Sequence, residues 1–123
     1  VYEASAGDVK PELYTYGLPR VGDHTFSQGL GSRVELGYRL THNRDVIPHL
    51  PKCCPGLGKC ATGSACPYHT ATEVFYAEDM DDGSSYTICD GSGEDNSCSN
   101  GQVDLSASDH CDYFGGICGT CCK

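Results

Sequence analysis

The first half of the chain contains two short runs whose hydrophobic and polar positions follow the period of a β-strand. Residues 12–16, which are β-branched and aromatic, predict a strand that ends in a turn at Gly17. Residues 34–40 predict a second strand, in which every second residue from Val34 onward faces the core. Arg39 falls among the positions predicted to face solvent.

A short helix is predicted between these two strands. Asp23 is placed as its N-cap, Phe26 and Leu30 lie one turn apart as a buried stripe, and Gly31 ends it. Two strands joined through a helix are usually parallel neighbours in one sheet. We therefore expect residues 1–52 to form one β-α-β crossover unit of an α/β protein, a unit that cannot stand alone.

Ten of the 123 residues are cysteines, and all of them lie in the second part of the chain. This density is typical of oxidising compartments and indicates a secreted, extracellular, disulfide-bonded protein. Residues 53–67 show no periodicity and predict an irregular Cys-rich loop, in which the adjacent Cys53 and Cys54 bond to different partners. The sequence starts at Val1 without an initiator Met, so we expect that an N-terminal segment has been removed.

Residues 68–123 are expected to complete the same domain with edge strands and a C-terminal segment. Residues 72–77 and 86–89 predict a hairpin-like pair of strands. The formal net charge of −9 argues against nucleic acid as a partner, because the chain would repel phosphate backbones. The longest apolar runs fall well short of the roughly 18 residues of a membrane-spanning helix.

One acidic residue, Asp45, follows the second predicted strand. Functional groups of open α/β sheets collect just beyond the carboxyl ends of strands, which is where Asp45 is placed. An Asp between a strand and a Pro-containing turn also commonly stabilises the turn itself. On position alone, both interpretations of Asp45 stay open.

Four segments together resemble the second half of the fungal class 3 lipases and feruloyl esterases, in the order in which that family has them. They are residues 14–23 with Tyr-Gly-Leu-Pro-Arg-Val-Gly, residues 38–48 with Tyr-Arg and Thr-His before Asp-Val-Ile-Pro, residues 69–75 with His-x-x-x-Glu, and residues 109–115 with Asp-His and Tyr-Phe-Gly. Their joint order and spacing make chance an implausible explanation. The resemblance implies an α/β fold, namely the C-terminal half of an α/β-hydrolase with a disulfide-rich extension.

The resemblance also implies a Ser-Asp-His triad, in that order along the chain. Asp45 and His110 take its second and third places, so that His110 accepts the proton of a serine hydroxyl while Asp45 fixes the imidazole tautomer. Candidates for the lining of a substrate pocket are Ile47, Pro48 and Leu50, for which plain core packing is an equally open interpretation.

Further implications of the resemblance concern the cysteines. Cys89 and Cys98 match a pair that closes a small disulfide loop, and Cys121 matches a terminal cysteine that reaches back to the N-terminal half. Neither a metal nor another cofactor is expected, since the Cys-x-x-Cys at residues 118–121 lacks the further ligands that would complete a tetrahedral site.

The sequence has no Gly-x-Ser-x-Gly elbow, which carries the nucleophile of such enzymes. In the family this elbow precedes the segment that begins at Tyr14. The leading hypothesis is therefore a secreted serine carboxylic-ester hydrolase, acting on acylglycerols or related lipid esters, whose serine lies on a separate N-terminal chain that stays joined to this one. The alternative, which the missing elbow favours, is a non-catalytic, disulfide-braced secreted binding module derived from the lipase fold.

Overall fold

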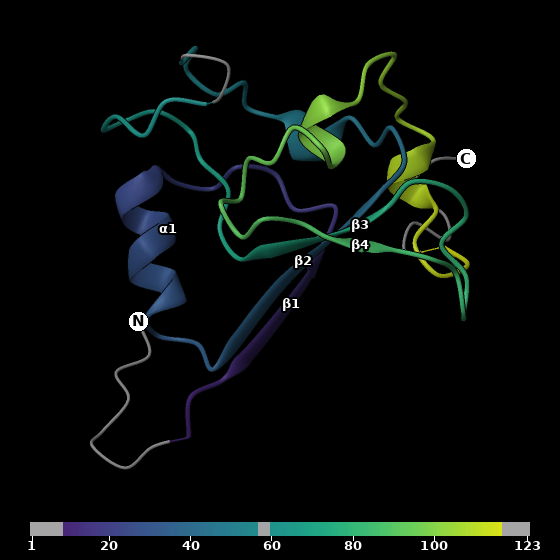
Figure 1. Ribbon diagram of the computed structural model, residues 1–123, viewed down its shortest axis with the longest axis horizontal. Coiled ribbons are helices and arrows are strands. Elements are labelled where there is room, and N and C mark those ends of the chain that lie inside the picture. The colour runs from purple at the N-terminus through teal and green to yellow at the C-terminus, as the bar shows by residue number, and fades with distance from the viewer. Residues whose placement is uncertain (1–8, 57–59, 117–123) are drawn as a thin grey trace.

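A four-stranded sheet forms the centre of the structure, a computed structural model that describes residues 9–56 and 60–116 (Figure 1). The strands stand in chain order, and they are β1 (Glu12–Tyr16), β2 (Leu36–His42), β3 (Thr72–Tyr76) and β4 (Thr87–Ile88). The first three strands are parallel, and β4 runs antiparallel to β3. The predicted β-α-β order with β1 and β2 parallel is confirmed, and so is the predicted pairing of β3 with β4.

The helix α1 (His24–Gly31) connects β1 to β2, and Asp23 caps it as predicted, accepting a hydrogen bond from the N–H of Phe26 at 2.9 Å. The predicted buried stripe is wrong, because Phe26 is 48% exposed and Leu30 is only half-buried. The buried residue of α1 is Ser27, whose hydroxyl donates to the carbonyl of His69 at 2.7 Å. A small hydroxyl side chain fits where the helix meets backbone, and a bulky ring does not.

The strand β2 begins and ends two residues later than the sequence predicts, and its buried face is the opposite one. Arg39 is fully buried, whereas Leu36 is 41% exposed. The reason is electrostatic: Arg39 lies directly across from Glu73 on β3, and its Nη2 donates to the Glu73 carboxylate at 3.1 Å. A buried charge is tolerated where a partner of opposite charge is built in beside it, which strand alternation in one sequence segment does not reveal.

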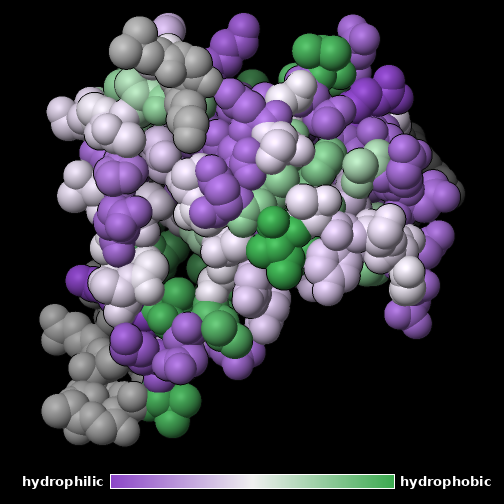
Figure 2. All heavy atoms as spheres, viewed as in Figure 1, coloured by the Kyte–Doolittle hydropathy of each residue, from purple (hydrophilic) through white to green (hydrophobic). Residues whose placement is uncertain are grey.

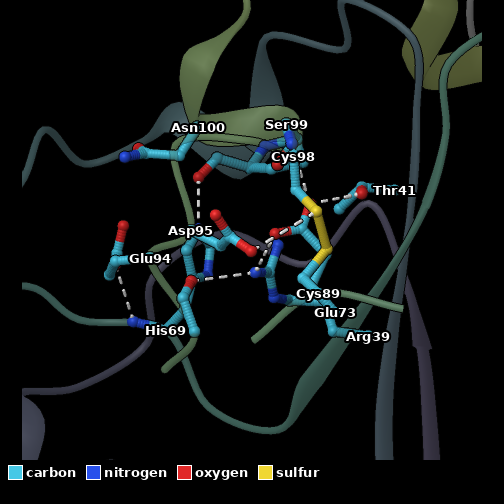
Figure 3. Close-up of polar contacts among 12 residues, drawn as sticks. Arg39, Thr41, His69, Glu73, Cys89, Glu94, Asp95, Cys98, Ser99 and Asn100 are labelled. Carbon is cyan, nitrogen blue, oxygen red and sulfur yellow. Dashed lines mark hydrogen bonds and ion pairs between the residues drawn. A yellow bond between two sulfur atoms is a disulfide. The ribbon is translucent and has the colours of Figure 1, made fainter. Parts of the chain in front are cut away.

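Glu73 joins the sheet to the chain that follows β4. Its second oxygen accepts from the Thr41 hydroxyl at 2.6 Å and from the backbone N–H of Ser99 at 3.3 Å. These contacts lie beside the disulfide between Cys89 and Cys98, as Figure 3 shows. The polar interior of this protein thus ties β2 and β3 to residues 89–99.

A second buried ion pair, between Arg20 and Glu94, fastens the turn after β1. The guanidinium donates twice to the carboxylate, from Nε at 2.8 Å and from Nη2 at 2.7 Å. The same carboxylate accepts from the backbone N–H of His69 at 3.0 Å. Both side chains of the ion pair are almost fully buried.

Glu94→Gln is expected to lower the free energy of unfolding by about 3 kcal/mol, because it leaves the buried Arg20 charge without a counter-charge. Urea unfolding followed by circular dichroism measures this loss in the complete protein. Glu35→Gln, at an exposed position, serves as the control and should change the midpoint little. Equal midpoints for the Glu94 variant and the wild type would contradict this account of the ion pair.

Three disulfides lie within the described part of the chain. Cys89 and Cys98 pair as the resemblance implies. The adjacent cysteines of the Cys-rich loop bond to different partners as predicted, and the two pairs are Cys53 with Cys60 and Cys54 with Cys66. Cys121 lies outside the described residues.

The described residues also contain three short 3-10 helices, which are η1 (Ile47–His49), η2 (Ser99–Gly101) and η3 (Asp109–Cys111). Figure 1 shows η1 and η2 next to each other, and η3 lies on the side toward which β2 and β3 point. Within residues 9–56 and 60–116, none of the helices has the length and apolar character needed to cross a membrane.

Candidate active site

Asp45 lies in the turn that follows β2 and is 2% exposed. Its N–H donates to the carbonyl of His42 at 3.0 Å, and its Oδ1 accepts from the N–H of Ile47 at 2.8 Å. These bonds fix both the backbone and the carboxylate. The turn interpretation of Asp45 is therefore correct, and it leaves the second carboxylate oxygen, Oδ2, for other partners.

The turn at Asp45 pairs with the segment that leads into η3. Asp45 and Ser106 form a parallel bridge, in which the N–H of Val46 donates to the Ser106 carbonyl at 3.2 Å and the N–H of Ser106 donates to the Arg44 carbonyl at 2.7 Å. This pairing brings η3, and with it His110, to the end of β2 across 65 residues of chain.

His110 and Asp45, the two residues predicted as a pair, meet directly. The distance from His110 Nδ1 to Asp45 Oδ2 is 2.9 Å. The Asp45 side chain is 1% exposed, whereas that of His110 is 32% exposed. A buried carboxylate that contacts Nδ1 of a partly exposed imidazole is the arrangement that orients a histidine for proton transfer at its other nitrogen, Nε2.

Tyr113, for which the sequence analysis predicted no role, completes the surroundings of the carboxylate. Its hydroxyl donates to Asp45 Oδ2 at 2.7 Å and accepts from the backbone N–H of His42 at 3.2 Å. Burial, together with the neighbouring Asp45 carboxylate, raises the pKa of Tyr113, so the phenol keeps its proton at working pH. The only signal in the sequence was a tyrosine three positions after the candidate histidine.

Gly17, at the end of β1, allows the pair to form. Its φ of +56° lies in the left-handed region, and a Cβ at this position would stand 2.8 Å from His110 Nδ1 and 2.9 Å from Asp45 Oδ2. Such distances are shorter than side-chain contacts permit. The sequence pattern identified Gly17 as a turn residue, but it gave no sign of this approach from a segment far along the chain.

The predicted pocket residues differ in their surroundings. Pro48 is fully buried, and its carbonyl accepts from Nε2 of His69 at 2.8 Å. Ile47 is half-buried, whereas Leu50 is 44% exposed and lines a groove that also includes Val46, His49 and Leu105. A role of these three residues in substrate binding stays a prediction.

His69, quoted in the resemblance, is a structural residue. It is 3% exposed, and burial, reinforced by Arg39 and Arg20, lowers its pKa to about 2. The imidazole is therefore neutral and donates from Nε2 to the Pro48 carbonyl. It braces the chain just beyond Asp45.

Two clusters of Cys and Glu side chains within the described ranges are compact enough to suggest a metal site. They are Cys53, Cys60 and Glu94 in one case, and Glu73, Cys89 and Cys98 in the other. In both clusters the cysteines are disulfide-bonded to each other, so neither offers the thiolates that bind zinc.

Comparison with known proteins identifies the family of the chain. Residues 2–54 match the family described as Lipase (class 3). The Rhizomucor miehei lipase is 34% identical over 111 residues, which are 89% of this chain and 27% of the relative. A Caenorhabditis elegans lipase is 31% identical over 94% of this chain and 38% of the relative, so the chain spans about a third of the length of such proteins.

Solved structures give the same result for the fold. Lipase II from Rhizopus niveus superposes with a TM-score of 0.66 at 30% identity, over 85% of this chain and 35% of that one. A triacylglycerol lipase, whose catalytic centre is described as a serine protease triad, superposes with a TM-score of 0.65 at 30% identity, over 84% of this chain and 35% of that one. The fold is thus part of an α/β-hydrolase. The chain belongs to the class 3 lipase family.

Proposed function

We propose that this chain supplies the acid and the base of a secreted serine carboxylic-ester hydrolase. The observation that carries the proposal is the contact of the buried Asp45 with Nδ1 of the partly exposed His110. Membership of the class 3 lipase family supports it. The third triad member is a serine outside these 123 residues, since the chain has no Gly-x-Ser-x-Gly elbow.

Each residue has a defined step in the reaction. His110 Nε2 takes the proton of the serine hydroxyl as the serine oxygen bonds to the ester carbonyl, and it returns the proton to the departing alcohol. Water then attacks the acyl-serine by the same proton route and releases the acid. Asp45 holds the tautomer with hydrogen on Nδ1 and stabilises the imidazolium that forms in each step.

The serine that this chain lacks can be supplied by a strand that pairs with the outer edge of β1. Within the described residues β1 is an outer strand, so one side of its backbone has no strand neighbour. A further parallel strand added there would end next to Gly17, where an added Cβ would stand 2.8 Å from His110 Nδ1 and 2.9 Å from Asp45 Oδ2. We propose that the N-terminal part of the enzyme, on a separate chain, adds this strand and carries the elbow at its end.

Exposed aromatic side chains near this edge support a covering partner. Tyr14 and Tyr16 on β1 are 49% and 46% exposed, and Phe114, whose ring contacts that of Tyr16, is 46% exposed. Figure 2 also shows a hollow between α1 and the strands, where a cavity has a mixed lining that includes Leu13, Gln28 and Glu35. The exposed aromatic side chains carry the argument, because a strand edge with large apolar side chains beside it is usually covered in the working protein.

The intact mass of the native protein, measured before and after reduction, tests the two-chain form. Release of a second polypeptide that contains Gly-x-Ser-x-Gly on reduction is the expected result, because Cys121 matches the cysteine that reaches back to the N-terminal half. A second polypeptide held without a disulfide would appear in a native mass measurement. A lone, monomeric chain in both measurements would contradict the proposal and favour the binding module.

Substrate class follows from the family, and we propose acylglycerols or related lipid esters. Among the relatives, one from Fusarium solani is described as a secreted mono- and diacylglycerol lipase, 31% identical over 84% of this chain and 29% of its own length. Release of fatty acid from emulsified acylglycerols, compared with phospholipid and feruloyl ester, measures the preference. Turnover of feruloyl ester alone would contradict the acylglycerol assignment.

Tyr113→Phe in the complete enzyme is expected to lower kcat about tenfold, because it removes one charge-assisted hydrogen bond to Asp45 and leaves the ring in place. Hydrolysis of a soluble p-nitrophenyl ester measures the effect. Tyr86→Phe, at a site that is 57% exposed, is the matched control. If the two variants were equally active, the Tyr113 hydroxyl would have no part in positioning the carboxylate.

A further inference from the structure

A buried histidine that the proposed mechanism does not use lies directly behind the candidate pair. His42, the last residue of β2, is 5% exposed. Its Nδ1 lies 3.1 Å from the backbone carbonyl of Asp109, and its Nε2 lies 3.0 Å from the backbone carbonyl of Glu78. Both ring nitrogens therefore face an atom that can only accept a hydrogen bond.

This arrangement constrains the state of the ring. A neutral imidazole carries hydrogen on one nitrogen and a lone pair on the other, so with two carbonyl partners one contact would set lone pair against lone pair. Hydrogen on both nitrogens satisfies both carbonyls. The resulting charge is close to the Asp109 carboxylate, which lies on η3 and also accepts from the N–H of Arg44 at 3.2 Å.

The hydrogen bonds of His42 reach three parts of the candidate site. The Asp109 carbonyl belongs to the peptide bond that joins Asp109 to His110, so the ring of His42 holds the backbone of the proposed base. The carbonyl of His42 accepts from the N–H of Asp45, and its N–H donates to the hydroxyl of Tyr113. No other described residue hydrogen-bonds the peptide of His110, the backbone of Asp45 and the side chain of Tyr113 together.

We propose that His42 is a positioning residue, whose ring donates through both nitrogens and clamps the turn carrying His110 between the end of β2 and the segment after β3. This inference rests on the proposed function for its catalytic consequence, but the clamp itself is a structural claim that can be tested separately. Loss of the clamp would let the backbone at His110 shift and lengthen its contact with Asp45.

The first test is the protonation of the ring in the complete enzyme. Long-range 1H-15N correlation spectra of protein labelled with 15N-histidine distinguish a ring with two N–H groups from either neutral tautomer. We expect both His42 nitrogens to carry hydrogen, and His42→Asn and His24→Asn assign the signals. A single protonated nitrogen on His42 would overturn the proposal, whatever the protein hydrolyses.

The second test is kinetic. His42→Asn is expected to lower kcat about tenfold with little change in KM, because one lost clamp bond disturbs the base and leaves substrate binding intact. His24→Asn, on α1 and away from the pair, should match the wild type. A folded His42 variant with unchanged kcat would overturn the proposal. If the His42 variant fails to fold, the spectrum of the wild type alone tests whether the ring donates through both nitrogens. If the wild type hydrolyses no ester, the proposed function is wrong, and the spectrum still tests the hydrogen bonds of His42.

Discussion

Asp45→Asn should lower kcat of the complete enzyme by about 10⁴-fold, the loss expected when a triad histidine is held in the wrong tautomer. The amide group of asparagine can turn its NH₂ toward His110 Nδ1, now 2.9 Å from the carboxylate. Nδ1 would then accept a hydrogen bond, and Nε2 would carry the hydrogen and lose its capacity to take the serine proton. The fold should persist, because asparagine keeps the size and most hydrogen bonds of the aspartate.

The measurement for Asp45→Asn is single-turnover acylation with a soluble ester, which isolates the first of the two steps that need the base. Asp82→Asn, an exposed substitution of the same kind, controls for the loss of one negative charge. KM should change much less than kcat, since the carboxylate is buried and does not contact the substrate. Activity within tenfold of the wild type would show that Asp45 is only a turn residue, the interpretation that the sequence left open.

Gly17→Ala is the second large effect that we expect, with kcat reduced by at least about 100-fold. The added methyl group would stand within 2.9 Å of atoms of both His110 and Asp45, and a displacement of about 1 Å in a catalytic group commonly costs this much. The left-handed φ of +56° adds a small loss of stability.

Gly83→Ala separates these two contributions to the Gly17 effect. Gly83 also has a positive φ, of +86°, but a Cβ there would meet no atom within 4 Å. The two variants should therefore lose stability to a similar extent in thermal unfolding, whereas only the Gly17 variant should lose turnover. Full activity of a folded Gly17→Ala enzyme would show that the His110 and Asp45 side chains do not occupy these positions during catalysis.

Local patterns predicted the elements of the fold better than they predicted what is buried. The run at residues 12–16 and the cap at Asp23 depend on neighbouring residues only, and both are confirmed. The burial of Arg39 depends on Glu73, which lies 34 positions further along the chain, and Phe26 is exposed because α1 presents Ser27 to the interior. Contacts between distant segments decide such cases, and one segment alone does not contain them.

In the candidate site, too, some residues were predicted from the sequence and others became evident only in the structure. Asp45 and His110 were predicted from the resemblance, and the structure brings them into contact. The sequence analysis did not assign three further residues to the site, namely Gly17, His42 and Tyr113. Their features have no sequence signature: Gly17 lacks a Cβ, the ring of His42 faces two carbonyls, and the hydroxyl of Tyr113 is buried. Their positions at the ends of β1 and β2 and just after η3 become informative only once the strands are in register.

The most direct test of the central claim is fluorophosphonate labelling of the native protein, followed by peptide mapping of the labelled site. We predict one labelled serine, within a Gly-x-Ser-x-Gly sequence outside these 123 residues, and labelling that is lost in the His110→Ala variant while the protein stays folded. A label on a serine of this chain, or labelling that persists without His110, would contradict the assignment of Asp45 and His110 as the acid and the base of the enzyme.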